Sequence, residues 1–309
     1  MAGCQMCGAD HDGGPETCPK SRVGKVIANK YELVSLIGCG GIAAVYEAHH
    51  RLLRRDVALK ILHPRFAKDE ELAKRFVREA RETAAIGHAA FVAVHDAGVS
   101  EDGCAFIEMA RLEGRDLWSI REEQGPIDPA RMVKIAIEVL HGLEALHKRG
   151  VVHRDLKSAN IFIEAGSDRV RLLDLGFAKA TDEHQLTDAE QLLGTPLYIS
   201  PEQCFDPRQV DGRADLFSLG VVMFENMTGS WPYTWSSKRE LLKHVMKGQL
   251  ERHPAVRRAE VPAWLDDIVA RSLAFDREKR FANATDMRAA LERGGGRAQR
   301  PSLLKRLLR

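Results

Sequence analysis

The sequence predicts an α+β fold of two lobes: a small antiparallel β-sheet lobe with one main helix, then a larger, mostly helical lobe. The first observation is that residues 31–110 contain several strand-length segments in which apolar and polar residues alternate. The second is that apolar residues recur at helical spacing through much of residues 115–292. The third is the length, because 309 residues suffice for two lobes that share a cleft.

The first lobe begins with two predicted strands joined by a glycine-rich loop. The segments "YELVSLIG" (31–38) and "AVYEAHH" (44–50) alternate as strands do, and the loop "GCGGIA" joins them. A third strand, "DVALKILH" (56–63), ends at Pro64, since proline cannot donate a ladder hydrogen bond.

One helix and two further strands complete this lobe. Residues 69–87 begin with acidic residues, carry apolar residues at Leu72, Phe76 and Ala80, and end in glycine. This pattern is typical of an amphipathic helix with a C-terminal stop. Residues 91–110 then read as two strands around the turn "EDG".

The second lobe is predicted to be mostly helical. Residues 129–150 carry apolar residues at helical spacing and end in glycine, and the short strand-like segments 160–165 and 170–176 follow. Residues 214–229, "ADLFSLGVVMFENMTG", are apolar on nearly all sides, which predicts a buried helix.

Composition excludes several classes of protein. Apolar residues make up 44% of the chain, enough for a core, and the net charge of +2 gives no general attraction to nucleic acid. No apolar run approaches the ~20 residues that a membrane-spanning helix needs, and residues 1–10 lack the pattern of a secretory signal. We therefore expect a cytoplasmic protein whose six cysteines are thiols or metal ligands, not disulfides.

The two ends of the chain differ in amino-acid composition from the middle. Residues 1–24 are polar, contain three cysteines, and are predicted to form a separate small element or a tail. Residues 293–309, "RGGGRAQRPSLLKRLLR", read as a glycine hinge followed by a basic tail. A solvated tail or an incidental short helix explains this segment best, and binding to a membrane surface would need more apolar area.

Charged residues recur at the ends of these elements. Lys60 ends the third strand in "VALK", and Glu79 lies on the helix that follows. Taken alone, each is better explained as a solvent-exposed side chain than as a functional one.

A denser set of polar residues follows in the second lobe. The segment "HRDLKSAN" places Asp155, Lys157 and Asn160 within six residues, between a helix and a strand. Asp174 lies between a strand and a glycine in "LLDLG", and Asp215 begins the predicted buried helix. An ordinary loop would not easily place these residue types in this order and spacing.

Taken together, these motifs resemble the protein kinase family, and in particular the eukaryotic-like serine/threonine kinases of bacteria. The glycine loop, V-A-x-K, H-R-D-L-K-x-x-N, D-x-G, a P-E ending and D-x-x-S-x-G occur in the family's order from about residue 31 to 291. The resemblance implies a bilobal protein kinase domain over residues 31–292. Its expected parts are an N-lobe (31–109), a hinge (110–114) and a C-lobe (115–292).

The resemblance assigns ATP and Mg²⁺ to named residues. Lys60 would hold the α- and β-phosphates, and Glu79 would pair with Lys60. Asn160 and Asp174 would supply oxygen ligands, which Mg²⁺ prefers. Asp155 would accept the proton of the substrate hydroxyl, and Lys157 would neutralise charge on the transferred group. A lysine two residues after the aspartate is the serine/threonine pattern.

The resemblance also implies which residues surround the nucleotide. The loop expected to cover the phosphates comprises Ile37, Gly38, Cys39, Gly40, Gly41, Ile42, Ala43, Ala44 and Val45. The residues expected around the adenine are Val45, Ala58, Met109, Ala110, Arg111 and Leu112, with Met109 in the gatekeeper position.

The sequence departs from the family pattern in a few places. Ala43 replaces the third glycine of the loop; the added methyl restricts φ, and we expect weaker or slower nucleotide handling at most. The family often has glutamate where Ala110 is aligned, and the neighbouring Glu108 leaves that alignment open by one or two residues. Glu202 and Arg280 are expected to form the buried ion pair of the family.

Regulation is expected in the segment between Asp174 and Glu202. Arg154 precedes Asp155, and in the family such an arginine pairs with a phosphorylated activation segment. The candidate phosphate acceptors are Thr187 and Thr181, of which Thr187 is preferred because it lies mid-segment. Thr195 is instead expected to contact Asp155 and Lys157 and to shape the substrate site.

The N-terminal cysteines raise a separate prediction. The segment "CQMCGADHDGGPETC" places Cys4, Cys7, His11 and Cys18 in the pattern C-x₂-C-x₃-H-x₆-C. Thiolates and an imidazole suit tetrahedral Zn²⁺, although the spacing does not match a zinc knuckle closely. The alternative is a flexible tail with exposed thiols.

Three functions compete for this sequence. The first is an active serine/threonine protein kinase that acts on protein substrates, including itself through its activation segment. The second is an ATP-binding pseudokinase scaffold, for which the altered glycine loop is the argument. The third, phosphorylation of a small molecule, is disfavoured because "GTPLYISPE" resembles the peptide-positioning loop of protein kinases.

Overall fold

The computed structural model describes residues 18–175 and 197–298. The chain divides into two compact units, the first ending at Glu113 and the second beginning at Gly114. No helix in these described ranges is both long enough and apolar enough to cross a lipid bilayer.

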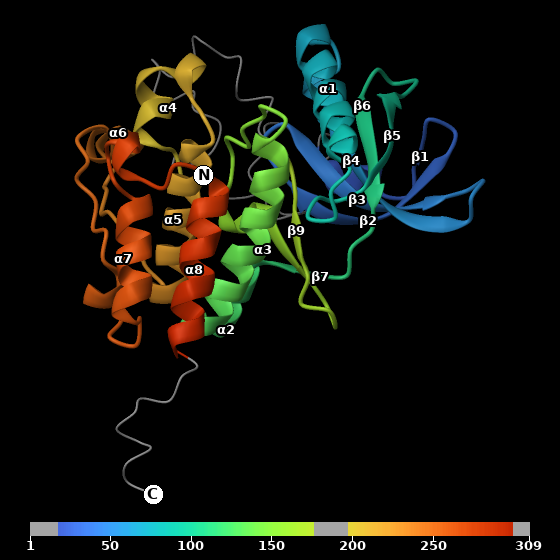
Figure 1. Ribbon diagram of the computed structural model, residues 1–309. Coiled ribbons are helices and arrows are strands. Elements are labelled where there is room, and N and C mark those ends of the chain that lie inside the picture. The colour runs from blue at the N-terminus through green and yellow to red at the C-terminus, as the bar shows by residue number, and fades with distance from the viewer. Residues whose placement is uncertain (1–17, 176–196, 299–309) are drawn as a thin grey trace, which may run out of the picture. The chain divides into compact units, whose positions relative to one another are not determined.

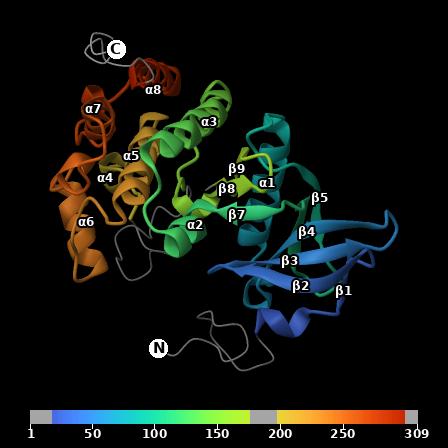
Figure 2. The same ribbon diagram turned by 90° about the horizontal axis from the view of Figure 1, so that it is seen from below.

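The first unit is a six-stranded antiparallel sheet with one helix beside it (Figure 1). Its elements are β1 (Val26–Ile27), β2 (Tyr31–Cys39), β3 (Ala43–His50), β4 (Arg55–Leu62), α1 (Glu70–Ile86), β5 (Val94–Val99) and β6 (Ala105–Ala110). The strands lie in the order β1-β2-β3-β4-β6-β5, and Figure 2 shows β2, β3 and β4 side by side.

Strand alternation gives this sheet two apolar faces. Val57, Leu59 and Ile61 of β4 pack with Tyr46 and Phe106 on one face. Leu62 packs on the other face with Phe76 and Ala80 of α1. Because side chains along a strand point alternately to opposite faces, the residue before or after Leu59 must face α1.

Helix α1 begins and ends where the sequence predicts. The side chain of Asp69 accepts a hydrogen bond from the N–H of Leu72 and caps the first turn. Gly87 adopts the left-handed conformation at the C-terminus, with φ of 59°, which glycine tolerates without strain.

Residues 18–27, which precede the predicted domain boundary, pack against the sheet. The hydroxyl of Tyr46 donates to the carbonyl of Pro19 at 2.8 Å. The buried guanidinium of Arg22 contacts Asp102 at 2.5 Å and the Sγ of Cys104 at 3.6 Å. This N-terminal strap therefore belongs to the first unit.

Loss of Arg22 should destabilise the first unit. We expect Arg22→Met to lower the free energy of unfolding by about 1–2 kcal/mol, because a buried charge-assisted hydrogen bond disappears while Asp102 remains half exposed. Amide hydrogen exchange in β1 and β2 would measure this. The exposed Lys25→Ala is the control, expected within about 0.5 kcal/mol of wild type. Equal protection in both variants would contradict the prediction.

The second unit is mostly helical, with a small three-stranded sheet. Its elements are β7 (Gly114–Asp116), α2 (Leu117–Gln124), α3 (Pro129–His147), β8 (Ile161–Glu164), β9 (Val170–Leu172), α4 (Pro201–Phe205), α5 (Arg213–Thr228), α6 (Lys238–Met246), α7 (Ala263–Ser272) and α8 (Ala284–Ala298). Figure 1 shows α3, α5, α7 and α8 packed beside one another.

Helix α5 is the centre of this unit, as its composition predicts. Every residue from Ala214 to Met227 is buried. Gly220 lies so close to Ser272 of α7 that an added Cβ would stand 2.4 Å from the hydroxyl oxygen. Small residues at such crossings allow two helices to approach closely.

The predicted glycine hinge after Arg293 is wrong. Helix α8 continues through Gly294 and Gly295 to Ala298. A Cβ at Gly294 would lie 2.0 Å from the ring of Trp264 on α7, so the glycine allows helix and indole to pack together. This packing offsets the poor helix propensity of glycine.

Candidate active site

In the first unit, a lysine and a glutamate form a buried ion pair. Nζ of Lys60 lies 3.3 Å from Oε1 of Glu79, and the side chains are only 11% and 8% exposed. Lys60 lies next to Leu59 on β4 and therefore faces α1, where Glu79 shares a buried surface with Phe76 and Ala80. The sequence alone favoured solvent-exposed side chains for these two residues, and the structure pairs them.

Several residues predicted to surround the nucleotide lie on the same sheet face as Lys60. Val45 pairs directly with Lys60 across β3 and β4, and Met109 pairs with Ala58 across β6 and β4. Residues opposite each other in an antiparallel pair share a face, so these four side chains project to one side. Ala110 and Leu112 follow Met109 along the chain.

Ala44 and Glu108 face the other way. Ala44 pairs with Ile61 in the apolar cluster of the opposite face. Glu108 pairs with Leu59 on that face, where it accepts hydrogen bonds from Tyr31 at 2.8 Å and Arg55 at 2.6 Å. Glu108 is thus engaged on the face opposite Lys60, whereas Met109 lies on the Lys60 face.

The position of the missing third glycine does not require a glycine. Ala43 pairs with Leu62 as part of β3 and has no positive φ. Its methyl group is 6% exposed and packs in the cluster of Leu62 and Phe76. An alanine therefore fits this backbone without strain, and its side chain adds to the core.

In the second unit, the segment after α3 brings an aspartate, a lysine and an asparagine together. Nζ of Lys157 lies 3.0 Å from Oδ2 of Asp155. Nδ2 of Asn160 donates to the backbone carbonyl of Asp155 at 2.9 Å and to its Oδ2 at 3.3 Å. These contacts hold the Asp155 carboxylate in one orientation.

Asp174 reaches the same end of the small sheet as Asn160. Ile161 and Leu172 pair at the ends of β8 and β9, and the N–H of Leu173 donates to the carbonyl of Asn160 at 2.9 Å. Asp174 is the next residue, with φ of 43°, a conformation uncommon outside glycine. The amide nitrogen of Asn160 is engaged by Asp155, which turns the amide oxygen away from that carboxylate. The donor set offers one carboxylate and one amide oxygen, which fits Mg²⁺.

A buried carboxylate on α5 holds the chain before Asp155. Asp215, which is fully buried, accepts hydrogen bonds from the backbone N–H groups of His153 and Arg154, both at 2.9 Å. Its Oδ2 also lies 2.7 Å from Nε2 of His147 on α3. Burial lowers the pKa of His153, although the nearby Asp215 opposes that effect. Asp215 thus joins α3 and α5 to the segment that leads to Asp155.

Arg154 adopts a left-handed backbone with φ of 63°. Its N–H binds Asp215, and its carbonyl accepts from Nε2 of Gln203 on α4 at 3.1 Å. These two contacts stabilise a conformation that costs roughly 1 kcal/mol in a non-glycine residue. This left-handed residue directly precedes Asp155, so its conformation sets the direction in which the chain enters Asp155.

A buried glutamate that the sequence motifs did not predict contacts the segment 155–160. Glu225 on α5 accepts hydrogen bonds from Ser158 at 2.6 Å and Tyr198 at 2.8 Å, and Arg121 lies 3.1 Å away. Burial raises the pKa of Glu225, and the Ser158 and Tyr198 hydrogen bonds oppose that effect. A second carboxylate, besides Asp215, within this mostly apolar helix was the available signal.

The predicted ion pair between Glu202 and Arg280 is confirmed. The fully buried guanidinium donates from Nη1 and Nη2 to the two carboxylate oxygens at 2.7 and 2.9 Å. It also donates to the carbonyls of Ala274, Arg213 and Phe275. This pair ties α4 to the segment that precedes α8.

Some predicted residues lie outside the described ranges. They are Thr181, Thr187 and Thr195 of the activation segment and Cys4, Cys7 and His11 of the N-terminal element. Cys18, the fourth predicted zinc ligand, is buried against the first unit. Within residues 18–175 and 197–298, no group of three or more metal-binding side chains is present.

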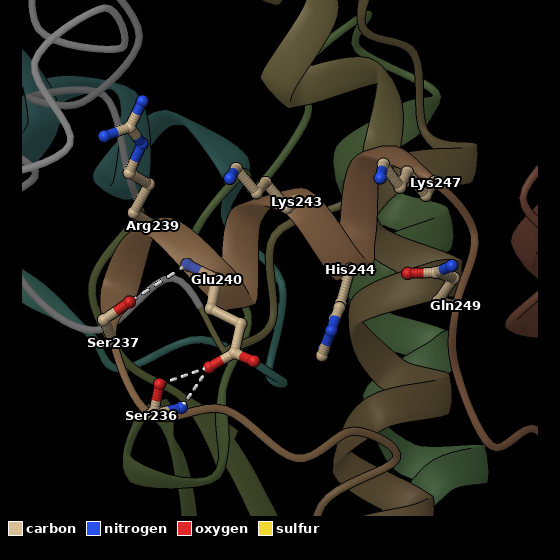
Figure 3. A pocket seen from close by; sticks show the side chains of 8 residues that line it. All are labelled: Ser236, Ser237, Arg239, Glu240, Lys243, His244, Lys247 and Gln249. Atoms are coloured by element: carbon tan, nitrogen blue, oxygen red, sulfur yellow. Dashed lines mark hydrogen bonds between the residues drawn. The ribbon is translucent and has the colours of Figure 1, made fainter.

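A separate depression of about 360 Å³ lies beside α6 (Figure 3). Arg239 and Lys243 project from one side of the helix, Lys247 follows its last residue, and Glu240 accepts hydrogen bonds from Ser236 on another side. The depression contains none of the predicted phosphoryl-transfer residues, so it is distinct from the site described above.

Residues 31–291 match the protein kinase domain family. This segment is most of the chain, so the chain belongs to that family. The predicted bilobal kinase fold is confirmed by this match and by the solved structures that resemble it.

Curated relatives point to the serine/threonine branch. The chain is 36% identical over 273 residues to serine/threonine-protein kinase PknB of Mycobacterium tuberculosis, covering 86% of this chain and 43% of PknB. It is 37% identical over 270 residues to PknH of the same organism, covering 87% of this chain and 42% of PknH. The chain thus spans less than half the length of these relatives.

A solved kinase domain has the same fold. The crystal structure of the Mycobacterium tuberculosis PknI kinase domain aligns with a TM-score of 0.67 at 26% sequence identity. The alignment covers 87% of this chain and 98% of the PknI chain.

Proposed function

We propose that this protein is a serine/threonine protein kinase that transfers the γ-phosphoryl group of ATP to hydroxyl groups of proteins. The observation that carries the proposal is the arrangement of Asp155, Lys157 and Asn160, held in place by the buried Asp215. The buried pair of Lys60 and Glu79 supports it from the first unit.

Each unit supplies one part of the chemistry. Lys60, oriented by Glu79, binds the α- and β-phosphates, and Val45, Ala58 and Met109 contact the adenine from the same sheet face. Asn160 and Asp174 hold Mg²⁺, which neutralises charge on the phosphates when bound.

Asp155 binds the acceptor hydroxyl and takes its proton. The contacts to Lys157 and Asn160 fix the carboxylate, so the hydroxyl oxygen is oriented before transfer. Lys157 then stabilises negative charge on the transferred group.

Phosphate transfer from γ-labelled ATP with Mg²⁺ tests this function. We expect incorporation into a generic protein acceptor and into the chain itself, with label on serine or threonine after acid hydrolysis. Label only on tyrosine, or transfer only to small molecules, would contradict the proposal. Nucleotide binding without any transfer would favour the pseudokinase scaffold, whose main argument is weakened by the unstrained backbone at Ala43.

Autophosphorylation at Thr187 is proposed to activate the kinase. We expect Thr187→Ala to lower the rate of substrate phosphorylation about tenfold or more, because phosphate at this position would pair with Arg154. Comparison with Thr181→Ala, under matched ATP and acceptor concentrations, identifies the regulatory site. Unchanged rate and unchanged self-labelling in Thr187→Ala would overturn the assignment.

A structural Zn²⁺ site is proposed for Cys4, Cys7, His11 and Cys18. The ligand types support it, while the burial of Cys18 against the first unit means that the site would have to form beside the sheet. Elemental analysis of the purified chain should find about one zinc per chain, and Cys7→Ser should lose it. Equal zinc content in the two proteins would contradict the proposal.

We further propose a cytoplasmic location and protein partners that are substrates. The balanced charge of the chain supports an absence of nucleic-acid partners. Membrane-surface contact through the basic tail, predicted as residues 293–309, is the weaker alternative.

A further inference from the structure

The tip of the glycine-rich loop is tied to the residues that follow β4. Nε2 of His63 lies 2.8 Å from the carbonyl oxygen of Gly40, and Nη2 of Arg65 donates to the carbonyl of Gly41 at 2.6 Å. The backbone N–H of His63 also donates to the carbonyl of Ile42 at 2.8 Å. Three successive carbonyls of the loop are therefore held from one side.

The sheet register explains why these residues meet. Ala43 begins β3 and pairs with Leu62, the last residue of β4. The chain leaving β4 must therefore lie beside the loop that enters β3. Pro64 starts a short 3₁₀ turn, Pro64–Phe66, that points Arg65 back toward the loop while its guanidinium stacks 4.8 Å above the ring of Phe66.

The histidine is built into the fold as a donor. His63 is only 7% exposed, and a carbonyl oxygen can only accept, so Nε2 carries the proton of this hydrogen bond. Arg65 is exposed and adds a charge-assisted hydrogen bond at the next carbonyl.

This arrangement orients the N–H groups of the loop. In a trans peptide the C=O and the N–H point in opposite directions. Holding the carbonyls of Gly40 and Gly41 toward His63 and Arg65 therefore turns the N–H groups of Gly41 and Ile42 away from them. Among the residues that the structure describes, neither N–H has an acceptor. Successive N–H groups that point the same way form a site for phosphate oxygens.

We propose that His63 and Arg65 are positioning residues that hold the glycine-rich loop in its phosphate-binding conformation. The inference rests on the proposed ATP-dependent function. The loop carries alanine where its family pattern has a third glycine, and the two side chains fix the tip from outside the loop. They do not contact the nucleotide; they act through the peptide groups of Gly40 and Gly41.

Comparing the affinities for Mg-ATP and for adenosine distinguishes this positioning role from a general contribution of the two side chains to the stability of the sheet. We expect His63→Leu to raise the dissociation constant for Mg-ATP about 5–10-fold, the effect of one hydrogen bond, and to leave adenosine binding within about twofold. His63→Gln should restore most of the affinity, because its side-chain amide can donate from a similar position. Arg65→Ala, at an exposed position, should weaken Mg-ATP by a similar factor without affecting folding.

His50→Leu is the matched control. His50 is 6% exposed and lies on β3 of the same sheet, on the opposite face beside Tyr31. We expect it to leave the ratio of ATP to adenosine affinity unchanged. Titration calorimetry with purified protein measures both ligands without requiring catalysis.

The binding results distinguish a failure of the positioning role from a failure of the proposed ATP-dependent function. If the wild type fails to bind Mg-ATP, the proposed function fails. If the wild type binds but Arg65→Ala and His63→Leu bind ATP as tightly as it does, only the positioning role is overturned. Equal weakening of ATP and adenosine would also overturn it, since that result indicates a disturbed sheet. If His63→Leu does not fold, Arg65→Ala alone decides.

Discussion

Asp155→Asn should reduce the rate of phosphate transfer by about 10²–10⁴-fold while the chain still binds Mg-ATP. The amide has nearly the shape of the carboxylate, so the contacts to Lys157 and Asn160 require little rearrangement. It cannot accept the proton of the acceptor hydroxyl, which is the role that we assign to Asp155. Initial rates of label transfer at saturating ATP, with calorimetric binding of ATP in parallel, separate the two effects.

Asp168→Asn is the control for this substitution. Asp168 is exposed, lies in the same unit and has φ of 52°, a conformation that asparagine tolerates. We expect its transfer rate to match the wild type. A transfer rate in Asp155→Asn within about threefold of wild type would remove Asp155 from the proton-transfer role.

Arg280→Met should destabilise the second unit by about 3–5 kcal/mol. The guanidinium is fully buried, and its loss leaves the Glu202 carboxylate and three backbone carbonyls without their donor. Methionine fills much of the volume beside Phe217 but donates nothing. Removal of one partner from a buried pair is therefore far more costly than removal of an exposed one.

Tryptophan fluorescence during urea unfolding measures this loss of stability in the second unit. The four tryptophans, Trp118, Trp231, Trp235 and Trp264, all lie after Gly114. Arg131→Ala is the control, because Arg131 pairs with the exposed Asp168 at 3.6 Å and should contribute at most about 1 kcal/mol. Equal unfolding midpoints for the two variants would show that the buried pair does not stabilise the unit.

Local patterns predicted most of the fold. The alternation of apolar and polar residues in 31–63 predicted the strands and which side chains share a face. The acidic start and the glycine end of residues 69–87 predicted α1. The motif residues of the site were found because their roles require particular side chains at short spacing. Asp155, Lys157 and Asn160 lie within six residues, so their geometry depends on one loop.

Contacts between distant segments were harder to predict. The partners of Glu225 are Arg121 of α2, Ser158 and Tyr198, and nothing in the spacing of these residues indicates their approach. The sequence around Gly294 predicts a hinge, and only the contact with Trp264 explains why the helix continues through this glycine. His63 and Arg65 appear as ordinary residues after a strand, because their role depends on the register between β3 and β4.

The N-terminal strap has a practical consequence for anyone who expresses this kinase domain. The family match begins at Tyr31, and a chain trimmed to that residue would lose β1, Arg22 and the carbonyl of Pro19. The hydroxyl of Tyr46 and the Sγ of Cys104 would then meet solvent on a newly opened apolar face, a surface prone to self-association. The folded first unit thus includes residues that precede the family match, from Cys18 onward, and cloning boundaries should include them.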